Sequence, residues 1–169
     1  NMATLKTATV YPGTCLIEGT NLSEGRGSDR PFEFIGAPYI DGGQWADSLN
    51  SLHLPGVTFE PIAFTPRNIP NVVTNPKHNG VRCGGVLVHV WDRNKFEPVK
   101  SVVYMLSTAR KMFSKSFQWR NNSIDRLAGT SKLRLSIQAE VPPERIIASW
   151  QQELEAFNRI RAQYVIYAP

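Results

Sequence analysis

Glycine and proline are distributed unevenly along this chain, and that distribution limits its fold more than any other feature. Most of the 12 glycines and 12 prolines lie within residues 1–85, where they interrupt regular structure every few positions. We therefore expect short strands joined by shaped loops in this half. Residues 86–169 hold few of either, and apolar residues recur there at helical spacing. Strands first and helices later predict an α+β fold, packed as one domain, rather than alternating βαβ units.

Periodicity and turn residues assign the individual segments. In the first half, Pro12-Gly13 predicts a turn that interrupts residues 8–16, and alternation predicts strands over 32–35, 57–64 and 84–91, a short helix over 44–52 and a loop over 67–79. In the second half, the spacing predicts a helix from Pro98, a shorter one from Thr130 to Ala139 that would also suit a strand, and a last helix after Pro142-Pro143 whose apolar stripe is continuous. Residues 164–167 are compatible with a closing strand.

Composition excludes several classes of protein. An apolar fraction of 41% over 169 residues can build one domain core, and no apolar run is long enough to span a membrane. The opening Asn1-Met2-Ala3 suggests a piece of a longer protein, with no signal peptide in view. The net charge of +5 resides in residues 86–169, but its basic residues alternate with acids, and no zinc spacing or aromatic RNA-binding signature accompanies them. We expect no nucleic-acid partner.

Metal and cofactor chemistry has little support in the residue pattern. Cys15 and Cys83 are far apart and form no CxxC pair, so they are either one disulfide or two buried thiols. The three histidines show no metal-ligand spacing, and neither a phosphate-binding loop nor a GxSxG or HExxH motif occurs. We expect no metal and no cofactor.

The chemistry-bearing stretch is the glycine-rich segment that runs from Tyr11 to Pro38. It gathers Glu18, Asn21, Ser23, Glu24 and Arg26 within nine positions, among glycines that let the backbone approach a ligand. Such side chains suit a polyhydroxylated ligand, or a carboxylate held by the arginine. The two glutamates also fit a glycosidase, one as acid and one as base or nucleophile. Equally, Arg26 could pair with a glutamate and simply fix the loop.

The same segment closely resembles a signature of a known family. The resemblance rests on YPGTCLIEGTNLSEGRG (11–27), RPFE (30–33) and GAP (36–38), and further along the chain on PGV-F (55–59), CGGV (83–86), D-L-GT (125–130) and the closing W…L…F…R…Y pattern (150–164). These motifs resemble the C-terminal half of the NamZ family, bacterial exo-β-N-acetylmuramidases long described as a domain of unknown function. The likeness covers nearly the whole chain.

The resemblance implies a role within a longer enzyme. Members carry an N-terminal Rossmann-like domain with most of the catalytic machinery and a Pro-Glu-His-Gly type motif, which this chain lacks. The chain would be the single C-terminal domain of a two-domain peptidoglycan hydrolase that releases N-acetylmuramic acid from non-reducing ends, in the periplasm or secreted. Its partners would be peptidoglycan fragments and its own N-terminal domain.

The resemblance also yields expectations for individual residues of the interdomain cleft. The substrate-binding candidates are Asn21, Ser23, Glu24, Arg26 and Arg30, and the catalytic candidates are Glu18 and Glu24, for which proton transfer is the less favoured role. The alternative function is a non-catalytic carbohydrate-binding or domain-docking module.

Overall fold

The structure is a computed structural model that describes residue 2 and residues 4–167. Its elements in chain order are α1 (Leu5–Thr14), the 3-10 helix η1 (Cys15–Gly19), β1 (Phe34–Ala37), α2 (Gly42–Asn50), β2 (Val57–Phe64), β3 (Cys83–Val90), α3 (Pro98–Met112), α4 (Asn121–Ala128), α5 (Lys132–Gln138), α6 (Pro143–Ser149) and α7 (Gln151–Arg161). The predicted α+β class is confirmed, with β1 and β2 in the first half, β3 across the boundary between the halves, and most helices in the second half.

The three strands form one antiparallel sheet in the order β1-β3-β2. The strand predicted over 57–64 is confirmed, that over 84–91 begins one residue earlier, and that over 32–35 begins two residues later. In the central strand β3, Val86, Leu87 and Val88 are all buried, and His89 near the end of the strand is exposed. The middle of this strand is therefore covered on both faces of the sheet.

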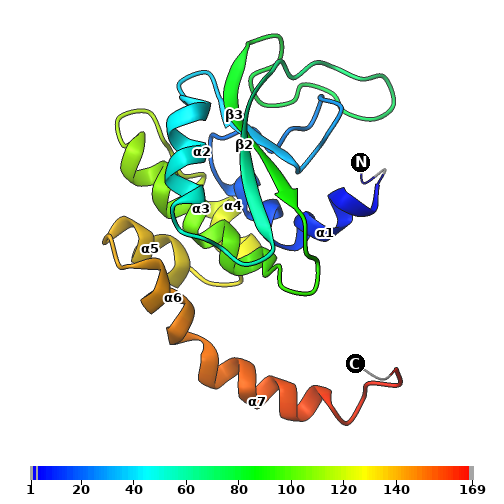
Figure 1. The fold of residues 1–169 in the computed structure, drawn as a ribbon, viewed down its shortest axis with the longest axis vertical. Helices are drawn as coiled ribbons and strands as arrows, with labels where there is room; N and C mark the ends of the chain where they lie inside the picture. The colour runs from blue at the N-terminus through cyan, green and yellow to red at the C-terminus, as the bar shows by residue number, and fades with distance from the viewer. Residues whose placement is uncertain (1, 3, 168–169) are drawn as a thin grey trace.

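Helices α1 and α2 pack against the sheet, and α3 packs against both of these helices, so that the three helices enclose the core with the sheet (Figure 1). Helix α2 begins because the Asp41 side chain accepts a hydrogen bond from the Gln44 N–H, 3.0 Å away. It buries Trp45 and Leu49 completely, and the Trp45 ring N–H donates to the Thr108 hydroxyl of α3 at 3.0 Å. The predicted helix at 44–52 is therefore confirmed, two residues earlier.

The structure corrects the prediction for the first segment. Residues 5–14 form helix α1, with Pro12 inside it, where a turn was predicted at Pro12-Gly13. Pro12 removes a hydrogen bond to the carbonyl of Ala8, but Ala8 is exposed, so water can satisfy that carbonyl. A Cβ on Gly13 would lie 2.0 Å from the Pro98 carbonyl oxygen. Gly13 is therefore required for the close approach of α1 to α3 rather than for a turn.

The structure also corrects the prediction for the C-terminal end. The predicted single helix is two helices, α6 and α7, that meet at Trp150. Its apolar stripe is not buried continuously, because Ile146 and Ile147 lie in the core whereas Leu154 and the apolar residues after it are exposed. Residues 164–167 form no strand, and α4 was not predicted. Within residues 130–139, which the sequence left open between helix and strand, Lys132–Gln138 form helix α5, and the Thr130 hydroxyl accepts from the Lys132 N–H at 3.2 Å.

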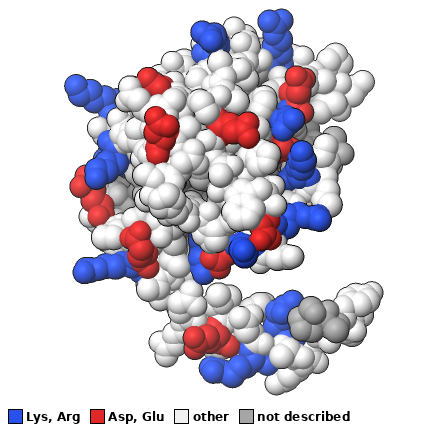
Figure 2. Space-filling view, in the orientation of Figure 1, with Lys and Arg blue, Asp and Glu red and all other residues white. Residues whose placement is uncertain are grey.

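Two further observations concern the surface. On the face shown in Figure 2, acidic and basic side chains are interspersed, as on a solvated surface. Within the described part of the chain, no helix combines the length and the apolar character needed to cross a bilayer.

Two glycine substitutions test the packing of this fold with opposite signs. An added Cβ at Gly85 in β3 would lie 2.1 Å from the Ile35 carbonyl oxygen, so Gly85→Ala must displace backbone and should lower the free energy of unfolding by roughly 1–3 kcal/mol. Gly43 lies in the first turn of α2, where an added Cβ would make only a van der Waals contact, 3.4 Å from Asp41 Oδ1, so Gly43→Ala should raise the free energy of unfolding by about 0.5–1 kcal/mol. Urea denaturation of both variants checks this, and equal effects would contradict the packing.

Candidate functional site

Within the segment Tyr11–Pro38, residues 20–23 lie between strand β1 and the loop that precedes α4. Ser23 exchanges two backbone hydrogen bonds with Gly36 of β1, at 2.7 and 3.1 Å. On its other side, Thr20 forms a β-bridge with Trp119. The segment is therefore fixed at both edges, and its polar side chains stand on a rigid base.

An ion network links the charged residues of this segment. Arg26 Nη2 lies 3.1 Å from Glu18 Oε1, and its Nε lies 3.5 Å from Glu24 Oε1. The second Glu24 oxygen lies 3.0 Å from Lys77 Nζ. Glu24 is only 4% exposed, whereas the side chains of Glu18 and Arg26 keep 32% and 27% of their surface. The network thus has a buried anchor, Glu24–Lys77, and an accessible edge, Glu18–Arg26.

Lys77 is enclosed by oxygen atoms of the segment. Its ammonium donates to the backbone carbonyls of Ile17, Glu18 and Leu22, at 3.2, 3.3 and 2.9 Å. Burial lowers the pKa of Lys77, and the neighbouring charge of Glu24 opposes that shift. A buried ammonium requires such partners because an unpaired charge would be expensive to desolvate. Lys77 therefore ties the 67–79 loop to the glycine-rich segment.

Asn21 has a structural set of partners. Its Nδ2 donates to the Ser116 carbonyl at 2.8 Å, and its Oδ1 accepts from the Tyr39 hydroxyl at 2.6 Å and from the Gln118 N–H at 2.9 Å. His78 Nε2 lies 2.7 Å from the Asn21 carbonyl oxygen. Burial raises the pKa of the Tyr39 hydroxyl to about 12, and its effect outweighs the hydrogen bond to Asn21, which lowers the pKa. The Asn21 side chain thus joins three separate stretches of chain.

Two predicted residues lie apart from the Glu18–Arg26 edge. The Ser23 hydroxyl is buried and accepts from the Gly25 N–H at 3.1 Å, which closes a local turn. Arg30 lies 3.6 Å from Glu33, whose other oxygen accepts from the Thr7 hydroxyl at 2.8 Å. The structure therefore groups Glu18, Glu24 and Arg26 and directs Arg30 toward α1.

Phe32 supports the arginine from beneath. Its ring is buried, with the Arg26 guanidinium 4.9 Å from the ring centroid and Tyr11 packed edge-on at 4.8 Å. Its φ is +66°, and its N–H donates to the Glu24 carbonyl at 2.6 Å. A phenylalanine in this left-handed conformation carries a strain of about 1–3 kcal/mol, which the surrounding contacts must offset. Several packing contacts therefore act together to fix the position of the Arg26 guanidinium.

Sequence reasoning did not single out Lys77 or His78 as parts of this site. The available signal was weak: they are the two ionisable residues of an otherwise uncharged stretch, 68–79. Cys15 and Cys83 are free thiols, and burial raises the pKa of Cys83 to about 11. In the described residues, no three His, Cys, Asp or Glu side chains come together as a metal site.

The arrangement favours recognition over proton transfer at Glu24, because that carboxylate is buried and lies between two cations. Glu18 and Arg26 instead face solvent in part, and a guanidinium offers a planar set of donors that a carboxylate or sugar hydroxyls can accept. Binding such a ligand would exchange the Glu18 contact of Arg26 for a new one.

The contacts of the Lys77 ammonium predict that this side chain contributes to the stability of the fold. Lys77→Met leaves three carbonyls and the buried Glu24 without their cation, so the free energy of unfolding should fall by about 2–5 kcal/mol. Lys115→Met, at an exposed position, is the matched control and should change it by less than about 0.5 kcal/mol. Equal loss in both variants, measured in urea, would remove the structural role of Lys77.

The raised pKa of Tyr39 predicts that the free energy of unfolding depends on pH. Its pKa is raised in the folded state, so the neutral phenol contributes stability that is complete below pH 10 and is lost as the pH rises toward 12. The advantage in unfolding free energy of the wild type over Tyr39→Phe should therefore shrink across that window. Urea denaturation at pH 8, 10 and 11 measures it, and a constant difference would exclude burial of the phenol.

Comparisons with known proteins agree on one relationship. Residues 9–167 match the family model described as exo-β-N-acetylmuramidase NamZ, C-terminal. The chain is 44% identical over 168 residues to the peptidoglycan β-N-acetylmuramidase NamZ of Bacillus subtilis; the match covers 99% of this chain and 39% of that protein. The chain therefore spans well under half the length of this curated relative.

Two solved structures share the fold. Both are DUF1343 family proteins of Bacteroides fragilis, each 24% identical to this chain. One has a TM-score of 0.82 over 95% of this chain and 42% of its own, and the other has a TM-score of 0.67 over 96% and 41%. With the family match over residues 9–167, these findings establish that the chain belongs to the NamZ C-terminal family.

Proposed function

We propose that this chain is the C-terminal part of a longer peptidoglycan-degrading glycoside hydrolase that releases N-acetylmuramic acid from non-reducing ends. The proposal is supported by the 44% identity to a peptidoglycan β-N-acetylmuramidase and by the NamZ family match. The substrate would be peptidoglycan fragments of the bacterial cell envelope, reached in the periplasm or after secretion. The catalytic groups would reside mainly in the Rossmann-like domain that precedes this chain.

The observation that carries a role for this domain is the accessible Glu18–Arg26 pair on its buried base. Arg26 is held by Glu18, Glu24 and the Phe32 ring, so its guanidinium is pre-organised while part of it stays open to solvent. N-acetylmuramic acid carries a lactyl carboxylate, and an arginine fork matches that group. Arg26 would bind the sugar at the wall of an interdomain cleft, and Glu18 would orient Arg26 or accept a sugar hydroxyl.

The other predicted residues would act through this pair. Glu24 would hold Arg26 in place, Asn21 and Ser23 would shape the loop, and Arg30 would lie at the edge of the site near α1. Of the two carboxylates, Glu18 is the better candidate for proton transfer, because Glu24 is buried against Lys77.

The second candidate is a carbohydrate-binding or domain-docking module without catalysis. The mutual pairing of Glu18, Glu24 and Arg26 favours it, because a loop satisfied by its own charges needs no ligand. Calorimetry of this chain with muropeptide fragments separates the readings: heat of binding supports the module, and none at millimolar ligand indicates that the sugar site needs the preceding domain.

Arg26→Ala in the longer protein tests the site. Loss of a charge-assisted contact of about 1.5–3 kcal/mol should lower kcat/KM on an N-acetylmuramic acid glycoside by roughly 10–100-fold. Arg93→Ala, an exposed arginine outside the network, should leave it unchanged. Wild-type rates for both variants would remove Arg26 from the site without affecting family membership.

A further inference from the structure

Helix α7 has an apolar face that the described chain does not cover. None of its residues, all of which the structure describes, is buried. Leu154, Phe157 and Ile160 are 44%, 59% and 58% exposed. At 100° per residue, these three and Trp150 fall on one side of the helix, while Gln152, Glu155 and Arg159 fall on the other. The helix is amphipathic, yet its apolar side faces solvent.

A groove continues this face onto the body of the domain. One part, of about 640 Å³, lies between α7 and the start of α3 and is lined by Val99, Trp150 and Leu154. A second part, of about 390 Å³, shares Val99 and Trp150, includes Leu127 of α4 and reaches Pro12 and Cys15. We define the α7 surface as the partly buried Trp150 together with the exposed apolar residues around it and along α7: Val99, Leu127, Leu154, Phe157 and Ile160.

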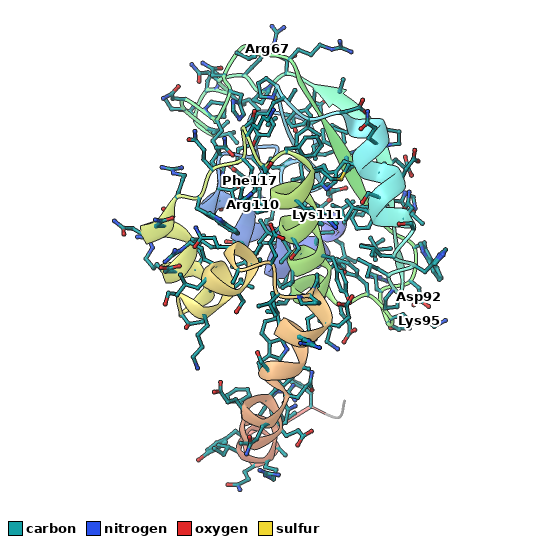
Figure 3. The ribbon with its side chains drawn as sticks, turned by 90° about the vertical axis from the view of Figure 1, so that its left-hand side faces the viewer. Arg67, Asp92, Lys95, Arg110, Lys111 and Phe117 are labelled. Atoms are coloured by element: carbon teal, nitrogen blue, oxygen red, sulfur yellow. The ribbon has the colours of Figure 1, made fainter. Side chains whose placement is uncertain are left out.

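Such a helix needs a partner to be stable. An isolated helix of 11 residues is marginal in water, and most helical stability in proteins comes from packing an apolar face. Two views agree that α7 projects from the rest of the molecule (Figures 1 and 3). The strong apolar pattern is therefore explained only if something outside the described chain packs on it.

We infer that the α7 surface is the docking surface for the preceding domain of the same longer polypeptide. This rests on the proposed function only in taking the chain as the C-terminal part of that protein. The curated relative is more than twice as long as this chain, and the matched family model is a C-terminal one, so the larger part of such a protein precedes the region described. A partner of sufficient size thus belongs to the same polypeptide.

The position of the α7 surface favours this occupant over a second copy of the chain. The groove ends at Pro12 in α1 and Cys15 in η1, the first elements after the point where the preceding domain would join. Glu153, Lys100 and Lys132 also line it, as in interdomain interfaces, which are more polar than obligate dimer contacts. In addition, the likeness to the longer solved protein covers 95% of this chain and so extends into α7.

The same position relates the α7 surface to the candidate site. Cys15 borders the groove, and Glu18 lies one 3-10 turn further along η1. The nearby charge of Glu18 contributes, after burial, to the raised pKa of the Cys15 thiol, which reflects their closeness. A domain seated on the α7 surface would therefore extend beside Glu18 and Arg26 and would form the opposite wall of their cleft.

Hydrogen–deuterium exchange on the longer protein tests the inference. With α7 docked, its backbone amides should exchange at least about tenfold more slowly than those of an unstructured peptide. Phe157→Asp places a charge in the docking face and should abolish this protection, whereas Gln152→Asp, on the polar side, should retain it. Continued slow exchange of β3 amides shows that each variant is folded.

Three results would overturn the inference. The first is fast exchange of α7 in the wild-type longer protein. The second is equal protection in Phe157→Asp. The third is protection that rises with protein concentration in parallel with a doubling of mass in light scattering, which would assign the surface to a second copy. Because no readout is enzymatic, a longer protein with protected α7 but no muramidase activity would contradict only the proposed function.

Discussion

The buried ammonium of Lys77 is the contact on which the organisation of this site depends. A single side chain from the 67–79 loop satisfies three carbonyls of the glycine-rich segment and the carboxylate of Glu24. An irregular segment has no helix or sheet ladder to hold it, so its carbonyls must find donors elsewhere. Lys77 supplies several at once, and it thereby fixes Glu24, which in turn holds Arg26 at the surface.

The residues that hold the site in place differ from those that are open to a ligand. The residues of the buried anchor are already satisfied, whereas the Glu18–Arg26 edge is fixed but partly open. The groove of the α7 surface reaches Cys15 of the 3-10 helix η1, which also contains Glu18. One neighbouring domain could therefore cover the apolar groove and at the same time face the Glu18–Arg26 edge. In the proposed function, the chain would supply one polar wall of a site that the preceding domain completes.

The sequence predicted the fold where periodicity and side-chain chemistry agreed, as in β2, β3, α2 and α3. It failed at Pro12-Gly13 because this pair, typical of turns, serves helix packing here. For the candidate site, the structure brings Glu18, Glu24 and Arg26 of the predicted segment together, and it shows the pairing of Arg26 that the sequence offered as one alternative. It could not predict Lys77, because the contact joins residues more than 50 positions apart and depends on tertiary folding.

The central claim is that Arg26 contacts the sugar in a cleft completed by the preceding domain. The most direct test is a crystal structure of the longer protein with N-acetylmuramic acid bound. The account predicts the Arg26 guanidinium about 3 Å from an oxygen of the sugar, with Lys77 still enclosed beneath Glu24. A bound sugar held entirely by the preceding domain, with Arg26 still paired only to Glu18 and Glu24, would contradict it.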